Sequence, residues 1–248
     1  MTKKILIIGG AGFIGMNIIQ SLGKKNNSVI TIADNFFRGK MDNDLSNLVK
    51  KYNVRVVSAD LTESSSFEQL ENDYDQVYML ASVVGVEYTQ KIPNELIRVN
   101  TMLIMNTLEW LKNSNCKKVL FTSTSECYAG SIEKFSYEVP TSENVPLCID
   151  DISNPRFTYA VTKMLGESGF LNYAKVFGFE CVIVRYHNVY GSRMGFKHVI
   201  PQVVKRFVDK ESPFKVYGHD QTRAFCHISD AVEGTVLAIE STPCALGS

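Results

Sequence analysis

The stretch Gly9-Gly10-Ala11-Gly12-Phe13-Ile14-Gly15 decides how the rest of this chain is interpreted. It follows a short apolar run, Lys4–Ile8, and it overlaps Phe13–Leu22, whose apolar residues have helical spacing. Glycines permit a tight turn, and they let backbone N–H groups approach a phosphate at the positive end of a helix. The spacing G-x-x-G-x-x-G differs slightly from the dinucleotide fingerprint G-x-G-x-x-G, so the turn needs support from its context.

Apolar runs and amphipathic stretches alternate through the first two-thirds of the chain. Continuous apolar strands alternating with helices are typical of a parallel sheet covered on both faces. The sequence therefore predicts an α/β fold with a doubly wound, Rossmann-like parallel sheet, and ligands beyond the carboxyl ends of its strands. The further predicted strands are Ser28–Ala33, Val54–Ser58, Gln76–Ala81, Lys118–Thr122 and Cys181–Arg185, and the long helices are Asn94–Lys112 and Tyr159–Phe177.

The alternation loosens after Tyr190. Glycines and prolines there separate a predicted helix, Val199–Asp209, from a short strand, Phe214–Tyr217, and a last helix, Asp230–Glu240. We expect a Rossmann domain over residues 1–190 and a small, partial substrate-binding lobe over residues 191–248.

Composition excludes several classes of protein. The 248 residues carry 26 Lys+Arg and 26 Asp+Glu, and this zero net charge argues against a nucleic-acid partner. No apolar run approaches the roughly 20 residues that cross a bilayer, so no membrane partner is expected. The six cysteines form no C-x-x-C pair, which argues against a disulfide framework and against a metal site. We expect a cytoplasmic protein without a metal.

Asp34 supports a dinucleotide site. It ends the second predicted strand, about 20 residues beyond the last glycine, where a carboxylate binds the adenosine ribose hydroxyls. A negative charge at this position repels a 2′-phosphate, which favours NAD over NADP, although Arg38 lies close by. The alternative is an Asp34-Asn35 turn in solvent, which the glycines make the weaker interpretation.

Two further groups of residues have the composition of a catalytic site. Tyr159 and Lys163 lie one helical turn apart, and a fixed ammonium together with a positively charged nicotinamide lowers the pKa of a phenol beside them. The resulting phenolate can take a hydroxyl proton while hydride leaves the same carbon for NAD. Thr124-Ser125-Glu126 follows the fifth strand, where a hydroxyl can bond a substrate oxygen and a carboxylate can move a second proton. The alternatives are a surface Tyr and Lys, and a helix-capping turn.

The order of these motifs resembles the extended short-chain dehydrogenase/reductases, the NAD-dependent nucleotide-sugar epimerase/dehydratase family. The resemblance covers essentially the whole chain. Besides the residues above, the matching motifs are Asp60-Leu61, Leu80-Ala81-Ser82, Thr124-Ser125-Glu126-Cys127-Tyr128, Arg185-Tyr-His-Asn-Val-Tyr-Gly191 and Gln221-Thr-Arg223-Ala-Phe225.

The resemblance implies a role for each matched residue. Tyr159 is the implied base, Lys163 holds the nicotinamide ribose, and Thr124 binds the substrate hydroxyl. Ser125 is placed with the substrate, whose diphosphate Asn188 and Arg223 would contact. The expected NAD contacts are Gly9, Gly12, Phe13, Ile14, Gly15, Asp34, Asn35, Asp60, Leu61, Leu80, Ala81, Ser82, Tyr159 and Lys163.

The resemblance leaves the reaction open. Epimerisation through a 4-keto nucleotide sugar is narrowly favoured over a 4,6-dehydratase or a uronate decarboxylase, either of which would use Glu126. A non-catalytic NAD-binding regulatory domain is the alternative of another class. The resemblance also implies a homodimer formed by the two long helices. Family members normally continue beyond the Asp230 helix, so we expect a shortened substrate lobe.

Overall fold

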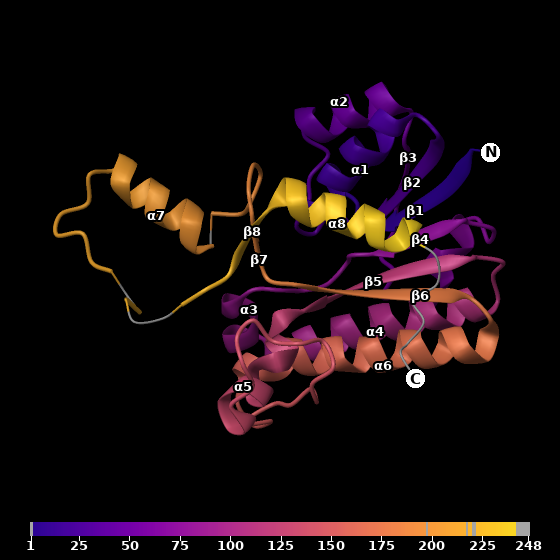
Figure 1. The fold of residues 1–248 in the computed structure, drawn as a ribbon. Helices are drawn as coiled ribbons and strands as arrows, with labels where there is room; N and C mark the ends of the chain where they lie inside the picture. The colour runs from indigo at the N-terminus through magenta and orange to yellow at the C-terminus, as the bar shows by residue number, and fades with distance from the viewer. Residues whose placement is uncertain (1, 197, 217, 220–221, 242–248) are drawn as a thin grey trace.

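The computed structural model describes residues 2–196, 198–216, 218–219 and 222–241. Its centre is a six-stranded sheet in which every neighbouring pair is parallel (Figure 1). This confirms the predicted doubly wound fold, because the strand order reverses at β1, with β2 on one side and β4 on the other. The order is β3 (Arg55–Ser58), β2 (Ser28–Asp34), β1 (Lys3–Ile8), β4 (Gln76–Met79), β5 (Lys118–Thr124) and β6 (Glu180–Tyr186).

Helices cover both faces of this sheet (Figure 1). One face carries α1 (Phe13–Lys25), α2 (Asn43–Tyr52) and α8 (Ile228–Glu240), and the other carries α4 (Pro93–Lys112) and α6 (Thr158–Phe177). The shorter elements are α3 (Val86–Lys91), α5 (Ala129–Phe135) and the 3₁₀ turns η1 (Ser64–Gln69), η2 (Ser125–Tyr128) and η3 (Pro155–Phe157).

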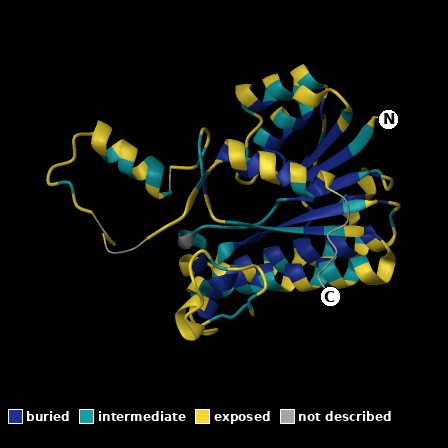
Figure 2. Cartoon of the chain, in the orientation of Figure 1, coloured by how far each residue is buried: buried dark blue, intermediate teal, exposed yellow. Residues whose placement is uncertain are grey.

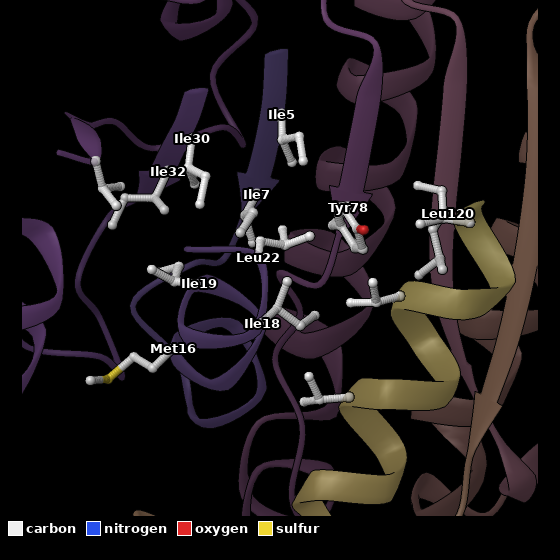
Figure 3. Close-up of a cluster of buried hydrophobic side chains, with 14 of the residues drawn as sticks. Ile5, Ile7, Met16, Ile18, Ile19, Leu22, Ile30, Ile32, Tyr78 and Leu120 are labelled. Carbon is white, nitrogen blue, oxygen red and sulfur yellow. The ribbon is translucent and has the colours of Figure 1, made fainter. Parts of the chain in front are cut away.

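The core on the α1 side consists of side chains from β1, β2, β4 and β5 that pack against α1 and α8 (Figure 3). Ile5, Ile7, Ile18 and Tyr78 are fully buried there. Each such aliphatic side chain contributes about 1.5–3 kcal/mol by leaving water. The last helix, α8, therefore lies on the sheet itself, although the expected lobe begins at residue 191; the domain division stays a prediction.

Helix and strand ends follow local chemistry. Asp42 caps α2 by accepting a hydrogen bond from Leu45 N (3.1 Å). Pro93 occupies the first turn of α4, where its missing N–H costs nothing. Gly178 ends α6 in a left-handed conformation, with φ +82°. Because all six strands are parallel, their carboxyl ends lie at one edge of the sheet, and the candidate site residues lie at this edge.

The region after β6 differs partly from the prediction. Two short strands, β7 (Asn188–Tyr190) and β8 (Phe225–His227), form a parallel pair that the sequence analysis did not anticipate. The predicted strand Phe214–Tyr217 was wrong over Phe214–Val216, which is irregular, and Tyr217 lies outside the described residues. Phe214 instead stacks on Phe207 of α7 (Val199–Val208), with ring centroids 4.3 Å apart.

Helix α7 extends away from the sheet (Figure 1). It has no buried residue, and Figure 2 shows it as exposed and intermediate positions only. The residues proposed for catalysis lie on β5, η2 and α6 against the sheet, whereas α7 belongs to the segment after β7 that extends away from the sheet.

Candidate active site

The glycine-rich turn lies where β1 ends and α1 begins. Gly9 has φ +86°, and a Cβ added there would lie 2.7 Å from Ala81 N. A Cβ on Gly15 would lie 2.7 Å from Gly10 Cα, so glycine is required at both positions. Gly12 is the N-cap residue of α1 and provides no side-chain hydrogen bond, and the first turn of α1 has no acidic residue. Its N–H groups and positive dipole therefore fit a pyrophosphate.

Asp34 lies at the end of β2, beside this turn. Its Oδ2 accepts a hydrogen bond from Ala11 N (3.0 Å), and its Oδ1 accepts one from Phe36 N (2.8 Å). Burial raises the pKa of Asp34, and the two backbone N–H groups oppose this effect. Asp34 thus also fixes the position of the glycine-rich turn.

The predicted adenosine contacts lie at neighbouring strand ends. The Asp60 carboxylate accepts hydrogen bonds from Thr62 N (3.0 Å) and from the Thr62 hydroxyl (2.8 Å). A further hydrogen bond joins Asp60 to the side chain of Asn35, and together these bonds outweigh desolvation and lower the Asp60 pKa. Leu61 is buried. The structure therefore brings Asn35 and Asp60 together, and their contact with NAD stays a prediction.

Residues 80–85 form a loop that contacts both the glycine-rich turn and helix α6. Strand β4 ends at Met79, and Leu80 N and Ala81 N both donate to Ile8 O (2.9 and 3.0 Å). The Ser82 side chain is hydrogen-bonded to Tyr159. The predicted strand Gln76–Ala81 therefore extends two residues too far, and the NAD contacts expected of Leu80, Ala81 and Ser82 stay predictions.

The sequence analysis missed Asn100, which holds this loop in place. Asn100 is buried on α4; its Oδ1 accepts from Val83 N (2.7 Å), and its Nδ2 donates to Val83 O (3.0 Å) and Thr162 Oγ1 (3.3 Å). A buried polar residue at helical spacing among apolar neighbours was the available signal.

Tyr159 and Lys163 lie on α6 against the end of the sheet. The Lys163 Nζ is buried, donates to Thr122 O (2.7 Å) and lies 5.6 Å from the centroid of the Tyr159 ring. Burial lowers the pKa of Lys163 to about 7, which the negative potential of Cys127 and Glu167 partly opposes.

The sequence analysis expected a lowered phenol pKa. In the polypeptide by itself burial raises the pKa of Tyr159 above its usual value, and the hydrogen bond to Ser82 opposes this effect only in part. Formation of a phenolate therefore needs a further positive charge in the site, as an oxidised nicotinamide ring would supply.

Thr124 is the last residue of β5 and is buried. Its Oγ1 accepts a hydrogen bond from Glu126 N (3.2 Å), which makes Thr124 the cap of η2. The capping interpretation is confirmed. A hydroxyl that accepts one bond can still donate its hydrogen to a substrate oxygen, so the substrate-binding role of Thr124 stays a prediction. Ser125 follows it and is partly exposed.

Glu126 is solvent accessible, yet the surrounding protein partly desolvates its carboxyl group. This desolvation raises the pKa of Glu126, while the positive charges of Arg156 and Arg223 lower it. The carboxyl group is therefore better suited to proton transfer near neutral pH than an ordinary glutamate.

Asn188 begins β7, and Arg223 lies two residues before β8, the strand that pairs with β7. Asn188 Nδ2 donates to Ala224 O (2.9 Å), next to Arg223, and both side chains are exposed. Because the charge of Arg223 also acts on Glu126, the structure groups all three residues on one side of the site.

Two features of the described part of the chain bear on other functions. It contains no group of three or more His, Cys, Asp or Glu side chains arranged to hold a metal ion. Within the same residues, every helix is too short or too polar to span a bilayer.

Comparison with known proteins decides the family. The model of the NAD dependent epimerase/dehydratase family matches residues 5–244. A UDP-N-acetyl-alpha-D-glucosaminuronate decarboxylase from Bacillus cytotoxicus is 35% identical over 97% of this chain and 72% of its own length. The chain belongs to the NAD dependent epimerase/dehydratase family. It is therefore an enzyme, and its cofactor is NAD, which fits the uncapped α1 turn and Asp34.

Solved structures of the epimerase/dehydratase family agree with this fold. UDP-glucuronic acid 4-epimerase from Bacillus cereus, in complex with NAD, superposes with a TM-score of 0.80 at 31% identity, covering 99% of this chain and 75% of that one. UDP-N-acetylglucosamine 4-epimerase from Methanobrevibacter ruminantium gives 0.81 at 27% identity, covering 97% and 74%. The chain thus spans about three quarters of the length of these family members.

Proposed function

We propose that the protein is an NAD-dependent nucleotide-sugar epimerase that oxidises the sugar transiently at C4. The observation that carries this proposal is the packing of Tyr159 and Lys163 of α6 against the end of β5, where Thr124 lies, and against the loop that contacts the glycine-rich turn. The substrate class is a UDP-linked hexose or hexuronate, which both 4-epimerases named above support.

The side chains divide the chemistry in the following way. Tyr159 removes the proton of the C4 hydroxyl, and Thr124 donates a hydrogen bond to the same oxygen. Lys163 holds the nicotinamide ribose and contributes positive charge near Tyr159. Bound NAD would supply the hydride acceptor for the oxidation at C4 and the hydride donor for the return step. Epimerisation then requires that the 4-keto sugar present its opposite face before Tyr159 gives the proton back.

Asn188 and Arg223 are proposed to bind the diphosphate of the substrate. Both lie exposed at the β7–β8 pair, and a guanidinium group can pair two phosphate oxygens at once. In this proposal the nucleotide lies over the segment after β7, and the sugar lies over the carboxyl ends of the strands.

A uronate decarboxylase or a 4,6-dehydratase is the second candidate. The raised pKa of Glu126 favours it, because a carboxyl group that can exchange a proton is needed to expel water or to protonate the carbon left after loss of CO₂. The 35% identity with a glucosaminuronate decarboxylase supports the same candidate.

We further propose a homodimer. The outer faces of α4 and α6 carry exposed apolar side chains, Ile97, Met102, Met105 and Leu165, which a second copy would cover. Sedimentation velocity tests this proposal, and a monomer at micromolar concentration would contradict it. A cytoplasmic location is also proposed, because five cysteines in the described residues are free thiols.

Product mass distinguishes the reactions. The protein is incubated with NAD and a panel of UDP-sugars that includes glucose, N-acetylglucosamine and their uronates. An epimerase gives a new chromatographic peak of unchanged mass. A product lighter by water or by CO₂ would replace the epimerase proposal with the second candidate. A protein that binds NAD but converts no sugar in the panel would contradict both.

A further inference from the structure

A salt bridge between the buried Glu167 and the partly buried Arg185 lies next to η2, the turn that carries Glu126. Glu167, on α6, is 5% exposed, and both of its carboxylate oxygens accept from Arg185 of β6 (Nε to Oε1, 2.8 Å; Nη2 to Oε2, 2.6 Å). Ser123 of β5 donates to the same carboxylate (2.5 Å). Ser123 and Arg185 are also direct partners in the β5–β6 register. One carboxylate thus joins two neighbouring strand ends to the helix that carries Tyr159 and Lys163.

Besides its two hydrogen bonds to Glu167, Arg185 donates a third one to Tyr128. Its Nη1 donates to the Tyr128 hydroxyl (2.5 Å), and its Cζ lies 4.9 Å from the centroid of the Tyr128 ring. Tyr128 is 5% exposed. It ends η2, the turn that Thr124 caps and that contains Glu126. The two ends of this turn are consequently held by different elements, Thr124 by β5 and Tyr128 by the guanidinium group.

The geometry of a guanidinium group makes this arrangement rigid. Two parallel hydrogen bonds to Glu167 fix the plane of the Arg185 fork, so the direction of the third N–H group is fixed as well. The Tyr128 hydroxyl then has one favourable position relative to α6. A displaced η2 would leave one N–H group of the partly buried Arg185 without its protein partner, which is unfavourable.

We propose that Tyr128 is a positioning residue, whose hydroxyl, held by Arg185, fixes the turn that carries Thr124 and Glu126 relative to Tyr159. The inference rests on the proposed function only in assuming that Thr124 acts on the C4 hydroxyl. Tyr128 itself reaches no reacting atom: it acts through the turn. Neither the family comparison nor the motif analysis assigns it this role.

The substitution Tyr128→Phe tests the inference with little disturbance, because it removes one hydroxyl group and leaves the Glu167–Arg185 pair intact. The matched control is Tyr74→Phe. Tyr74 is 1% exposed, and its hydroxyl accepts from Glu71 N (3.3 Å). It lies just before β4, where the amino ends of the strands lie, whereas η2 follows the carboxyl end of β5. Both variants lose one buried hydroxyl, but only one loses it behind the turn.

The first measurement is amide hydrogen exchange, which needs no turnover. In Tyr128→Phe, the amides of residues 125–131 should exchange about tenfold faster, while those of α4 and β1 keep their rates. Tyr74→Phe should leave residues 125–131 unchanged. Unchanged exchange of the turn in Tyr128→Phe would overturn the inference, whatever the enzyme's substrate.

The second measurement separates positioning from general destabilisation. With a substrate found by the panel above, kcat of Tyr128→Phe should fall about tenfold while KM and the NAD dissociation constant change less than twofold. A fall in kcat that Tyr74→Phe matches would overturn the inference. Faster exchange of the turn together with a wild-type protein that converts no sugar would refute the proposed function and leave the positioning of the turn supported.

Discussion

The buried ammonium of Lys163 gives the sharpest test of the structure, through the pH dependence of stability. The perturbation is Lys163→Met, which keeps much of the side-chain volume and removes the charge. Burial lowers the pKa of Lys163 to about 7, whereas a lysine in an unfolded chain titrates near about 10.4. Between these two values the unfolded chain binds a proton that the folded chain does not bind, so this residue makes stability rise with pH.

The magnitude follows from the same shift. Each pH unit well inside the window contributes about 1.4 kcal/mol, and less near pH 7 where the folded Lys163 is half protonated, so from about pH 7 to 9 Lys163 should add roughly 2 kcal/mol to the free energy of unfolding. Below pH 7 the folded protein must hold a buried ammonium, and the stabilisation is absent. Lys163→Met removes this pH dependence without altering that of the other groups.

The assay is urea denaturation of NAD-free wild type and variant at several pH values in this window, with the two free energies subtracted at each pH. The difference, wild type minus variant, should rise by about 2 kcal/mol. The control Lys50→Met changes an exposed lysine of α2 and should give a flat difference. A flat difference for Lys163→Met as well would refute a neutral, buried Lys163 in the alkaline range.

Three further predictions concern single side chains. Tyr159→Phe should reduce turnover roughly 10² to 10⁴-fold and keep NAD affinity, as titration and kinetics can show; unchanged turnover would exclude the phenolate mechanism. Asp34→Asn should weaken NAD binding about tenfold and narrow the preference over NADP, measured by calorimetry, and an unaltered preference would contradict the assigned ribose contact. Tyr78→Phe should raise the free energy of unfolding by about 1 kcal/mol, because the buried Tyr78 hydroxyl has no hydrogen-bond partner among the described residues; a loss of stability would point to a bound water.

Local patterns were sufficient for the sheet and for the position of the glycine-rich turn beside Asp34. Apolar runs such as Lys4–Ile8 needed no tertiary information to be identified as buried strands, and the glycine spacing fixed where α1 begins. The structure confirms the parallel order and places Asp34 beside the turn. These features depend on neighbours within a few residues or on the repeated strand–helix alternation.

The interactions that hold the site together depend on residues far apart in the sequence. Glu167 and Ser123 are 44 residues apart, and Arg185 meets Tyr128 across 57 residues. No local pattern predicts such pairs, because they follow from the β5–β6 register and from the packing of α6. The wrong strand at Phe214 has the opposite cause: a local β-like composition without a strand to pair with.

The β5–β6 register has a consequence for how this chain tolerates insertions and deletions. Because strand side chains alternate between faces, adding one residue within β6 before Arg185 would turn the guanidinium group to the other face and bring a hydrophobic neighbour toward Glu167. Such a change would leave a buried carboxylate without its cation while keeping the strand apolar. Length variation among descendants of this sequence should therefore be absent from Glu180–Tyr186 and concentrate in the exposed loop over residues 137–145.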